Sequence, residues 1–152
     1  MFRNTKQGIK NLFIWFRIIW NDRWWDHHYL YDILRFKLGL MEKSFRKYGH
    51  YVGSEKDAYN MKACCDILDR LIADDYHDDA FKEHDEKWGE IDMKVGPDGK
   101  LDITRTNVKT AEDEFIERKE FMERCTAEGQ AETDDVIELF KIIARNVQKW
   151  RD

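Results

Sequence analysis

A run of aromatic and basic side chains near the N-terminus is the part of the sequence best suited to bind a ligand. Residues 20–29 read Trp-Asn-Asp-Arg-Trp-Trp-Asp-His-His-Tyr. Aromatic rings stack on nucleobases, and arginines pair with phosphate groups. A site for a small anionic nucleotide would draw on eight residues of this run and the helices around it: Arg17, Arg23, Trp24, Trp25, His27, His28, Lys37 and Arg70. The alternative is that the tryptophans pack at a helix junction among solvated charges.

Two of these charged positions fall on or near apolar stripes. Lys37 lies eleven residues after Asp26, three helical turns along the same face. Arg70 and Asp69 sit in an apolar stretch of their helix. A charge that faces a core needs a partner or a ligand, because burying it alone is costly. A structural ion pair and a ligand-binding role both stay open.

Histidines and carboxylates form a second cluster, whose chemistry would be that of a metal-dependent phosphohydrolase. His77 and His84 are seven residues apart and share a helical face, and Asp85 follows His84. Such an enzyme needs a further His and Asp that converge on the ion, and the sequence marks none. A solvated acidic helix is the other interpretation. Because no phosphate loop, nucleophile elbow or Cys/His dyad is visible, we predict neither a catalytic residue nor a cofactor.

The elements that position these residues are mostly helices. Apolar residues at i, i+3 and i+4 spacing, with capping residues and glycines between them, predict the helices. We expect them at about 5–20, 23–48, 54–74 and 78–88, then from a cap at Thr110 onward, with an interruption at Gly129 and a restart after it.

The periodicity changes between residues 91 and 105. Apolar and polar residues alternate over 91–95 and again over 101–105, with Gly-Pro-Asp-Gly between them, which predicts a β-hairpin. A lone two-stranded hairpin must pack on helices to be stable. The predicted fold is therefore mainly α: a single-domain helical bundle of five to six helices over residues 1–152, with one inserted β-hairpin.

The first helix is apolar on more than one side. One stripe is formed by Ile9, Leu12, Phe13, Phe16, Ile19 and Trp20, and a second side by Ile14, Trp15 and Ile18. Such a helix is buried, oligomeric or associated with a membrane. We expect a homo-oligomer that forms through residues 5–48.

Composition excludes several classes of protein. The chain has 152 residues, 42% of them apolar, 38% charged and 14% aromatic, which argues against disorder. No apolar stretch reaches the roughly 18–20 residues of a membrane-spanning helix. Three cysteines without metal-ligand spacing fit free thiols in a reducing compartment, so we expect a cytoplasmic protein.

The net charge of −5 conceals an uneven distribution. Residues 1–53 contain ten lysines and arginines against four acidic residues, a net charge of +6. The other 99 residues contain 16 against 27, a net charge of −11. An acidic chain seldom coats a polyanion, so we expect no binding to long nucleic acids. A local basic pocket for a small nucleotide remains compatible with this distribution.

Part of the sequence resembles small uncharacterised proteins of tailed-phage genomes. The resemblance lies in Ile-Trp-Asn-Asp-Arg-Trp-Trp-Asp at 19–26, Arg-Phe-Lys-Leu at 35–38 and Leu-Asp-Arg-Leu-Ile-Ala-Asp-Asp-Tyr at 68–76. It covers roughly residues 9–90. The resemblance implies a viral accessory protein in the bacterial cytoplasm and brings no known activity with it.

Three hypotheses of function follow. Small phage accessory proteins often antagonise host defence, so the first is a protein that sequesters a cyclic or other small nucleotide signal without catalysis. The second is an inhibitor or virion-associated module that contacts a host protein through the acidic surface of residues 54–152. The third is the metal-dependent phosphohydrolase with His77, His84 and Asp85.

Overall fold

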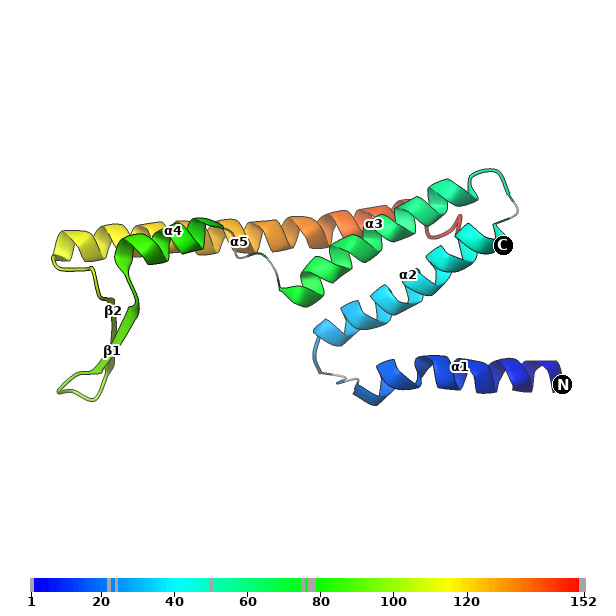
Figure 1. The fold of residues 1–152 in the computed structure, drawn as a ribbon, viewed down its shortest axis with the longest axis horizontal. Helices are drawn as coiled ribbons and strands as arrows, with labels where there is room; N and C mark the ends of the chain where they lie inside the picture. The colour runs from blue at the N-terminus through cyan, green and yellow to red at the C-terminus, as the bar shows by residue number, and fades with distance from the viewer. Residues whose placement is uncertain are drawn as a thin grey trace. The chain divides into compact units, whose positions relative to one another are not determined.

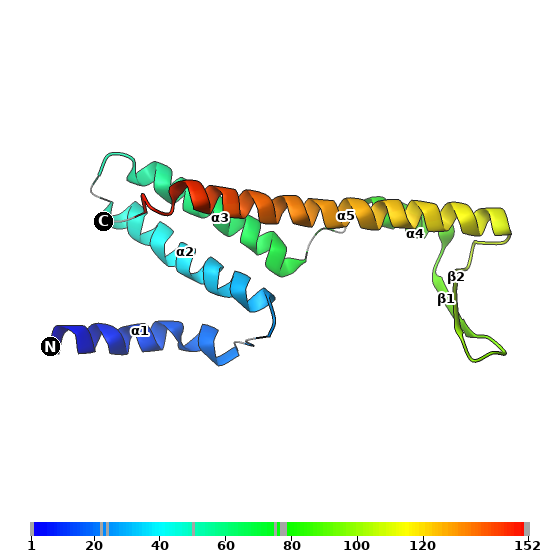
Figure 2. The ribbon, with the colours of Figure 1, turned by 180° about the vertical axis from the view of Figure 1, so that it is seen from behind.

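The computed structural model describes residues 2–21, 23, 25–49, 51–74, 76 and 79–150, and of residues 2–4, 21, 79 and 80 the backbone alone. This part of the chain contains five helices and one hairpin (Figure 1; seen from behind in Figure 2). In chain order they are α1 (Phe2–Asn21), α2 (His28–Tyr48), α3 (Ser54–Ala73), α4 (Asp79–Trp88), β1 (Ile91–Val95), β2 (Leu101–Arg105) and α5 (Ala111–Asn146). The prediction of a mainly helical fold with an inserted β-hairpin is confirmed.

The chain forms two compact units. Unit 1 comprises residues 1–73 and 136–152, and unit 2 comprises residues 74–135. Helix α5 contributes residues to both units.

The core of unit 1 lies around the helix pair α2 and α3, which run side by side in opposite directions (Figures 1 and 2). The apolar positions of α3 recur at helical spacing, and its buried residues include Met61, Cys64, Cys65 and Leu68. From the other helices of unit 1, Leu38, Phe45 and Leu139 are also buried. Burial raises the pKa of the free Cys64 thiol to about 11, so this side chain stays protonated and packs as a small apolar group.

A bidentate ion pair joins the two helices of this pair. The guanidinium of Arg35 on α2 donates from Nε and Nη2 to the two carboxylate oxygens of Asp69 on α3, at 2.7 and 3.0 Å. This contact raises the pKa of Arg35 above its ordinary value. Asp69 therefore forms a structural ion pair, but with Arg35, a partner that the sequence does not predict, and its side chain is 53% exposed rather than turned to the core.

Helix α2 begins five residues later than the sequence predicts. The backbone N–H of Asp26 donates to the carbonyl oxygen of Arg23 at 2.8 Å, which closes a turn there. The carboxylate of Asp26 then accepts from the N–H of His28 at 3.0 Å, at the first residue of the helix. An acidic side chain is favourable at this end of a helix, and this hydrogen bond fixes the start of α2 at His28.

Helix α5 has the predicted cap but not the predicted interruption. The N–H of Asp113 donates to Thr110 Oγ1 at 3.1 Å, and the N–H of Thr110 donates to Asp113 Oδ2 at 3.0 Å. This reciprocal pair forms a capping box. The prediction that Gly129 breaks the helix is wrong, since α5 continues through it to Asn146. A glycine costs a helix about 1 kcal/mol relative to alanine, which the strong helix formers around Gly129 offset.

Replacing Gly129 with alanine tests this continuity. A Cβ at this position meets no atom within 4 Å, and the backbone is helical. We expect Gly129→Ala to raise the free energy of unfolding by about 0.5–1 kcal/mol, measured by urea denaturation. Gly99→Ala serves as the control. Gly99 has a φ of +77°, which alanine adopts only at a cost, so this variant should have a lower free energy of unfolding than the parent chain. A destabilised Gly129→Ala would mean that the helix is broken there after all.

Candidate functional site

The hairpin of unit 2 is a preformed two-stranded sheet. Its strands are antiparallel and paired in the register Ile91 with Arg105 and Val95 with Leu101. The connecting turn is closed by the N–H of Gly96 on the carbonyl oxygen of Lys100, at 2.8 Å. In the turn, Gly99 adopts a positive φ, which is costly for residues other than glycine.

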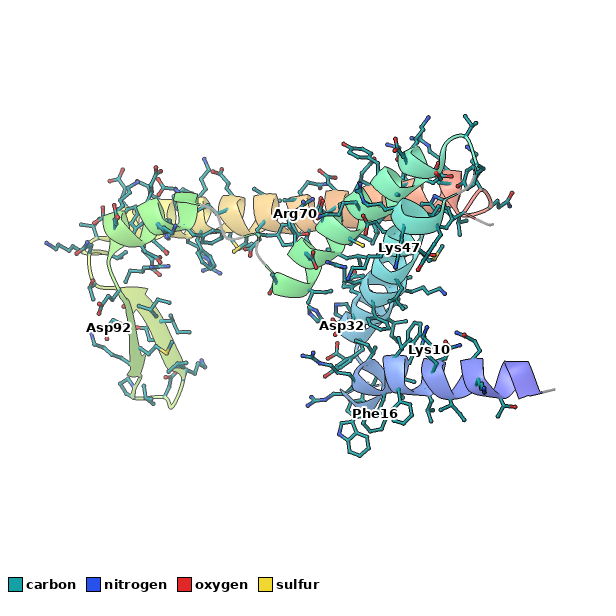
Figure 3. All side chains as sticks on the ribbon, turned by 45° about the vertical axis from the view of Figure 1, so that its right-hand side comes forward. Lys10, Phe16, Asp32, Lys47, Arg70 and Asp92 are labelled. Carbon is teal, nitrogen blue, oxygen red and sulfur yellow. The ribbon has the colours of Figure 1, made fainter. Side chains whose placement is uncertain are left out.

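Alternation along the strands gives the sheet two different faces. The polar face carries Asp92, Lys94, Asp102 and Thr104 (Asp92 is marked in Figure 3). The other face, here called the hairpin face, consists of Ile91, Met93, Val95, Leu101 and Ile103. These five side chains are between 54% and 74% exposed. The sequence predicts a hairpin packed on helices, but its apolar face is left open to solvent.

Arg105, the last residue of β2, anchors this sheet to the two helices of unit 2. Its side chain is only 10% exposed. The guanidinium Nη1 donates to Asp85 Oδ1 on α4 at 2.6 Å and to the carbonyl oxygen of Gly89 at 3.0 Å. Its Nε lies 3.3 Å from Glu117 Oε1 on α5. One side chain therefore fixes the base of the hairpin to α4 and α5, and the sheet extends away from both helices (Figures 1 and 2).

Next to this anchor, α4 and α5 are joined by polar and aromatic contacts. His84 is fully buried, and its Nε2 lies 3.4 Å from the carbonyl oxygen of Glu117. One turn further along α4, Lys87 and the indole Nε1 of Trp88 donate to the two carboxylate oxygens of Glu120, at 2.7 and 2.8 Å. These two hydrogen bonds lower the pKa of Glu120 below its ordinary value. The contacts hold α4 against α5 and give the hairpin a fixed base.

Arg105 also lines two cavities. One of about 560 Å³ is lined by residues that include Ile91, Arg105, Phe121 and Cys125. Another of about 250 Å³ is lined by residues that include Ile91, Ile103, Arg105 and Phe121. Both cavities are continuous with the hairpin face through Ile91. Each of these recesses is lined by residues of both the hairpin and the helices.

Sequence reasoning missed Arg105 and Glu117, although the sequence carries a signal for the arginine. The alternation that places Leu101 and Ile103 on the apolar face continues to Arg105. A charged residue at an apolar position needs a partner, which here is a carboxylate on each of two helices. No comparable signal marks Glu117 among the many carboxylates of α5.

The residues predicted to bind a nucleotide lie on several elements of unit 1. Arg17 on α1, Arg23 and Trp25 in the α1–α2 connection, and His27 are exposed, whereas Trp24 lies outside the described residues. The imidazole rings of His27 and His28 stand 4.8 Å apart, and Tyr31 meets both edge-on. The structure therefore brings together the two histidines with Tyr31, which the prediction did not include.

Lys37 and Arg70 do not converge. Arg35 faces α3, as its ion pair with Asp69 shows. Lys37 is two residues further along α2, about 200° around the helix axis, so it points away from α3. Arg70 is exposed on α3. Lys37 thus points away from the helix that carries Arg70.

The alternative metal site has little support in the described residues. His77 lies outside them, and His84 Nδ1 is 3.9 Å from Asp85 Oδ1. Across the part of the chain that is described, no group of three or more His, Cys, Asp or Glu side chains is arranged to hold a metal ion.

Comparison with known protein families, with curated proteins and with solved structures yields no match to this chain. Among the described residues, each helix is too short or too polar to span a bilayer.

Replacing Arg105 tests whether it anchors the hairpin. In Arg105→Met, the largely buried carboxylate of Glu117 loses its cation, so we expect the free energy of unfolding to fall by about 1–3 kcal/mol. Asp85→Asn should cost less, because the side chain of Asp85 is 61% exposed. Urea denaturation followed by tryptophan fluorescence measures both variants. Equal stability of Arg105→Met and the parent chain would refute the anchor.

Proposed function

We propose that this chain is a non-catalytic interaction protein that binds a partner protein through the hairpin face. The observation that carries the proposal is the exposure of all five apolar side chains on one face of an ordered sheet. Contiguous exposed apolar surface is characteristic of protein–protein contact sites. This proposal corresponds to the second of the three hypotheses, with the hairpin as the centre of the contact.

Preorganisation supports the hairpin as a binding element. Arg105 and the contacts between α4 and α5 hold the sheet in one position before a partner arrives. A rigid surface loses little conformational entropy on binding, so more of the apolar burial appears as affinity.

The surroundings of the hairpin face indicate the charge of the partner. Residues 74–135 contain 21 aspartates and glutamates against nine lysines and arginines. Protein interfaces commonly combine an apolar centre with a polar rim, and complementary rim charges speed and orient association. The proposed partner is therefore a protein that has an apolar patch surrounded by basic residues.

The nucleotide-sequestering and phosphohydrolase hypotheses stay predictions with less support. The cations proposed for the nucleotide are spread over α1, the α1–α2 connection, α2 and α3, and Lys37 points away from α3. The metal alternative retains only His84 and Asp85 in the described residues. The five residues of the hairpin face, by contrast, all lie together on one sheet.

Site-specific photocrosslinking tests the proposal. A benzophenone amino acid replaces Met93 on the hairpin face or, as the matched control, Lys94 on the polar face. In bacterial cells we expect a crosslink to one partner from position 93 and not from position 94. With that partner purified, Ile103→Asp should lower the affinity at least about tenfold in calorimetry, because it would bury an unpaired charge. Lys94→Gln should change the affinity little.

Three results would contradict the proposal. The first is equal crosslinking from positions 93 and 94. The second is an unchanged affinity of a folded Ile103→Asp variant, with folding checked by circular dichroism. The third is crosslinking from position 93 only to a second copy of the chain, which would make the hairpin face a surface for self-association.

A further inference from the structure

Helix α1 in unit 1 exposes an apolar face of its own. This face, here called the α1 face, consists of Ile9, Leu12, Phe13, Phe16, Ile19 and Trp20. The six side chains are between 53% and 77% exposed. At 3.6 residues per turn they cover an arc of about 120° of the helix circumference. The rings of Phe16 and Trp20 lie 5.2 Å apart, so the aromatic side chains form a contiguous surface.

A row of cations borders the α1 face. Residues 1–21 contain four lysines and arginines and no aspartate or glutamate. Lys6, Lys10 and Arg17 follow one another around the helix within about 60° of the edge of the apolar arc. Their side chains are exposed, and among the described residues none of them forms an ion pair. Figure 3 marks Lys10 and Phe16 on this helix.

The opposite side of α1 is the side that packs within unit 1. Ile14, Trp15 and Ile18 are half-buried. The ring of Trp15 meets that of Phe36 on α2 edge-on, with centroids 4.9 Å apart. The α1 face is therefore available for another contact while α1 stays attached to α2.

We propose that α1 binds in the plane of an anionic lipid membrane, with the α1 face in the headgroup–acyl boundary and the basic row on lipid phosphates. Interfacial helices combine aromatic and aliphatic residues on one face with lysines and arginines beside it. Tryptophan and phenylalanine suit the boundary because their rings are large and apolar, and the indole N–H can reach polar groups. The cations in the middle of α1 keep the helix from crossing the bilayer, in agreement with the absence of a spanning helix among the described residues.

Charge favours a lipid surface over a second copy of the chain as the occupant. Two α1 helices in contact would bring their basic rows to the rim of one interface, and residues 1–21 offer no carboxylate to compensate them. An anionic membrane supplies the missing negative charge. The attraction contributes about 1 kcal/mol of binding free energy for each cation near the surface, which is about a fivefold gain in affinity. Residues 74–135 have a net charge of −12, so the same anionic surface repels them. The contact with the membrane is therefore expected at α1.

Vesicle flotation with the full chain tests this proposal. The vesicles consist of phosphatidylcholine alone or of phosphatidylcholine mixed with phosphatidylglycerol. We expect binding to the mixed vesicles, at least about tenfold weaker binding to phosphatidylcholine alone, and loss of binding as salt rises. Sedimentation velocity of the same samples without vesicles reports the oligomeric state.

Three variants assign the binding to α1. Lys10→Glu with Arg17→Glu should weaken binding to mixed vesicles at least about tenfold, and so should Phe13→Gln with Phe16→Gln. Lys37→Glu with Lys43→Glu reverses two exposed charges on α2 and changes the net charge as much as the first variant does, so it controls for net charge and should leave binding within about twofold. All replaced side chains are exposed, so the variants are expected to fold, which circular dichroism checks.

The outcomes separate the lipid surface from the other occupants. Equal binding to both kinds of vesicle, or binding that survives the charge reversals on α1, would overturn the proposal. So would absence of vesicle binding, whether or not the chain forms an oligomer. An oligomer that the phenylalanine variant converts to a monomer would identify a second copy as the occupant. None of these results bears on the hairpin face, which lies in the other unit.

Discussion

The ion pairs of Arg105 are the interaction on which the arrangement of unit 2 depends. A two-stranded sheet cannot bury an apolar face against itself, and an isolated hairpin is only marginally stable. Here the last residue of β2 reaches Asp85 on α4, Glu117 on α5 and the carbonyl oxygen of Gly89. This polar anchor replaces the apolar packing that hairpins otherwise need. It leaves the hairpin face free for another molecule.

The hairpin face of unit 2 lies in an acidic part of the chain, and the α1 face of unit 1 in a basic one. The hairpin face belongs to the acidic residues 74–135, whereas the α1 face is bordered by cations, and residues 1–21 contain no aspartate or glutamate. Surfaces of like apolar character but opposite charge select different partners, because electrostatic complementarity sets specificity more than affinity. The uneven charge distribution therefore has a physical role in our proposals: it directs one face to a basic protein and the other to an anionic membrane.

Periodicity in the sequence predicts the elements well, because it reports which side chains share a face. It gives the strands 91–95 and 101–105 with their observed bounds, and the cap at Thr110. Periodicity does not show whether another element packs on an apolar face, so the exposure of the hairpin face was not predicted. Gly129 shows a further limit, since the cost of one glycine is small against a long helix of good helix formers. The start of α2 depends on the turn between Arg23 and Asp26 and on the hydrogen bond from the His28 N–H to the Asp26 carboxylate, which spacing alone does not reveal.

Amide hydrogen exchange of the isolated chain tests most directly whether Arg105 holds a preformed sheet. Hydrogen bonds at Gly96–Lys100 and Thr106–Glu90, with the alternation of antiparallel ladders, place the amides of Lys94 and Thr104 in cross-strand hydrogen bonds. Our account predicts that these two amides are protected, and that Arg105→Met removes this protection while the amide of Leu68 in α3 is unaffected. Exchange of Lys94 and Thr104 at the rate of an unstructured chain, or protection unchanged in Arg105→Met, would contradict it.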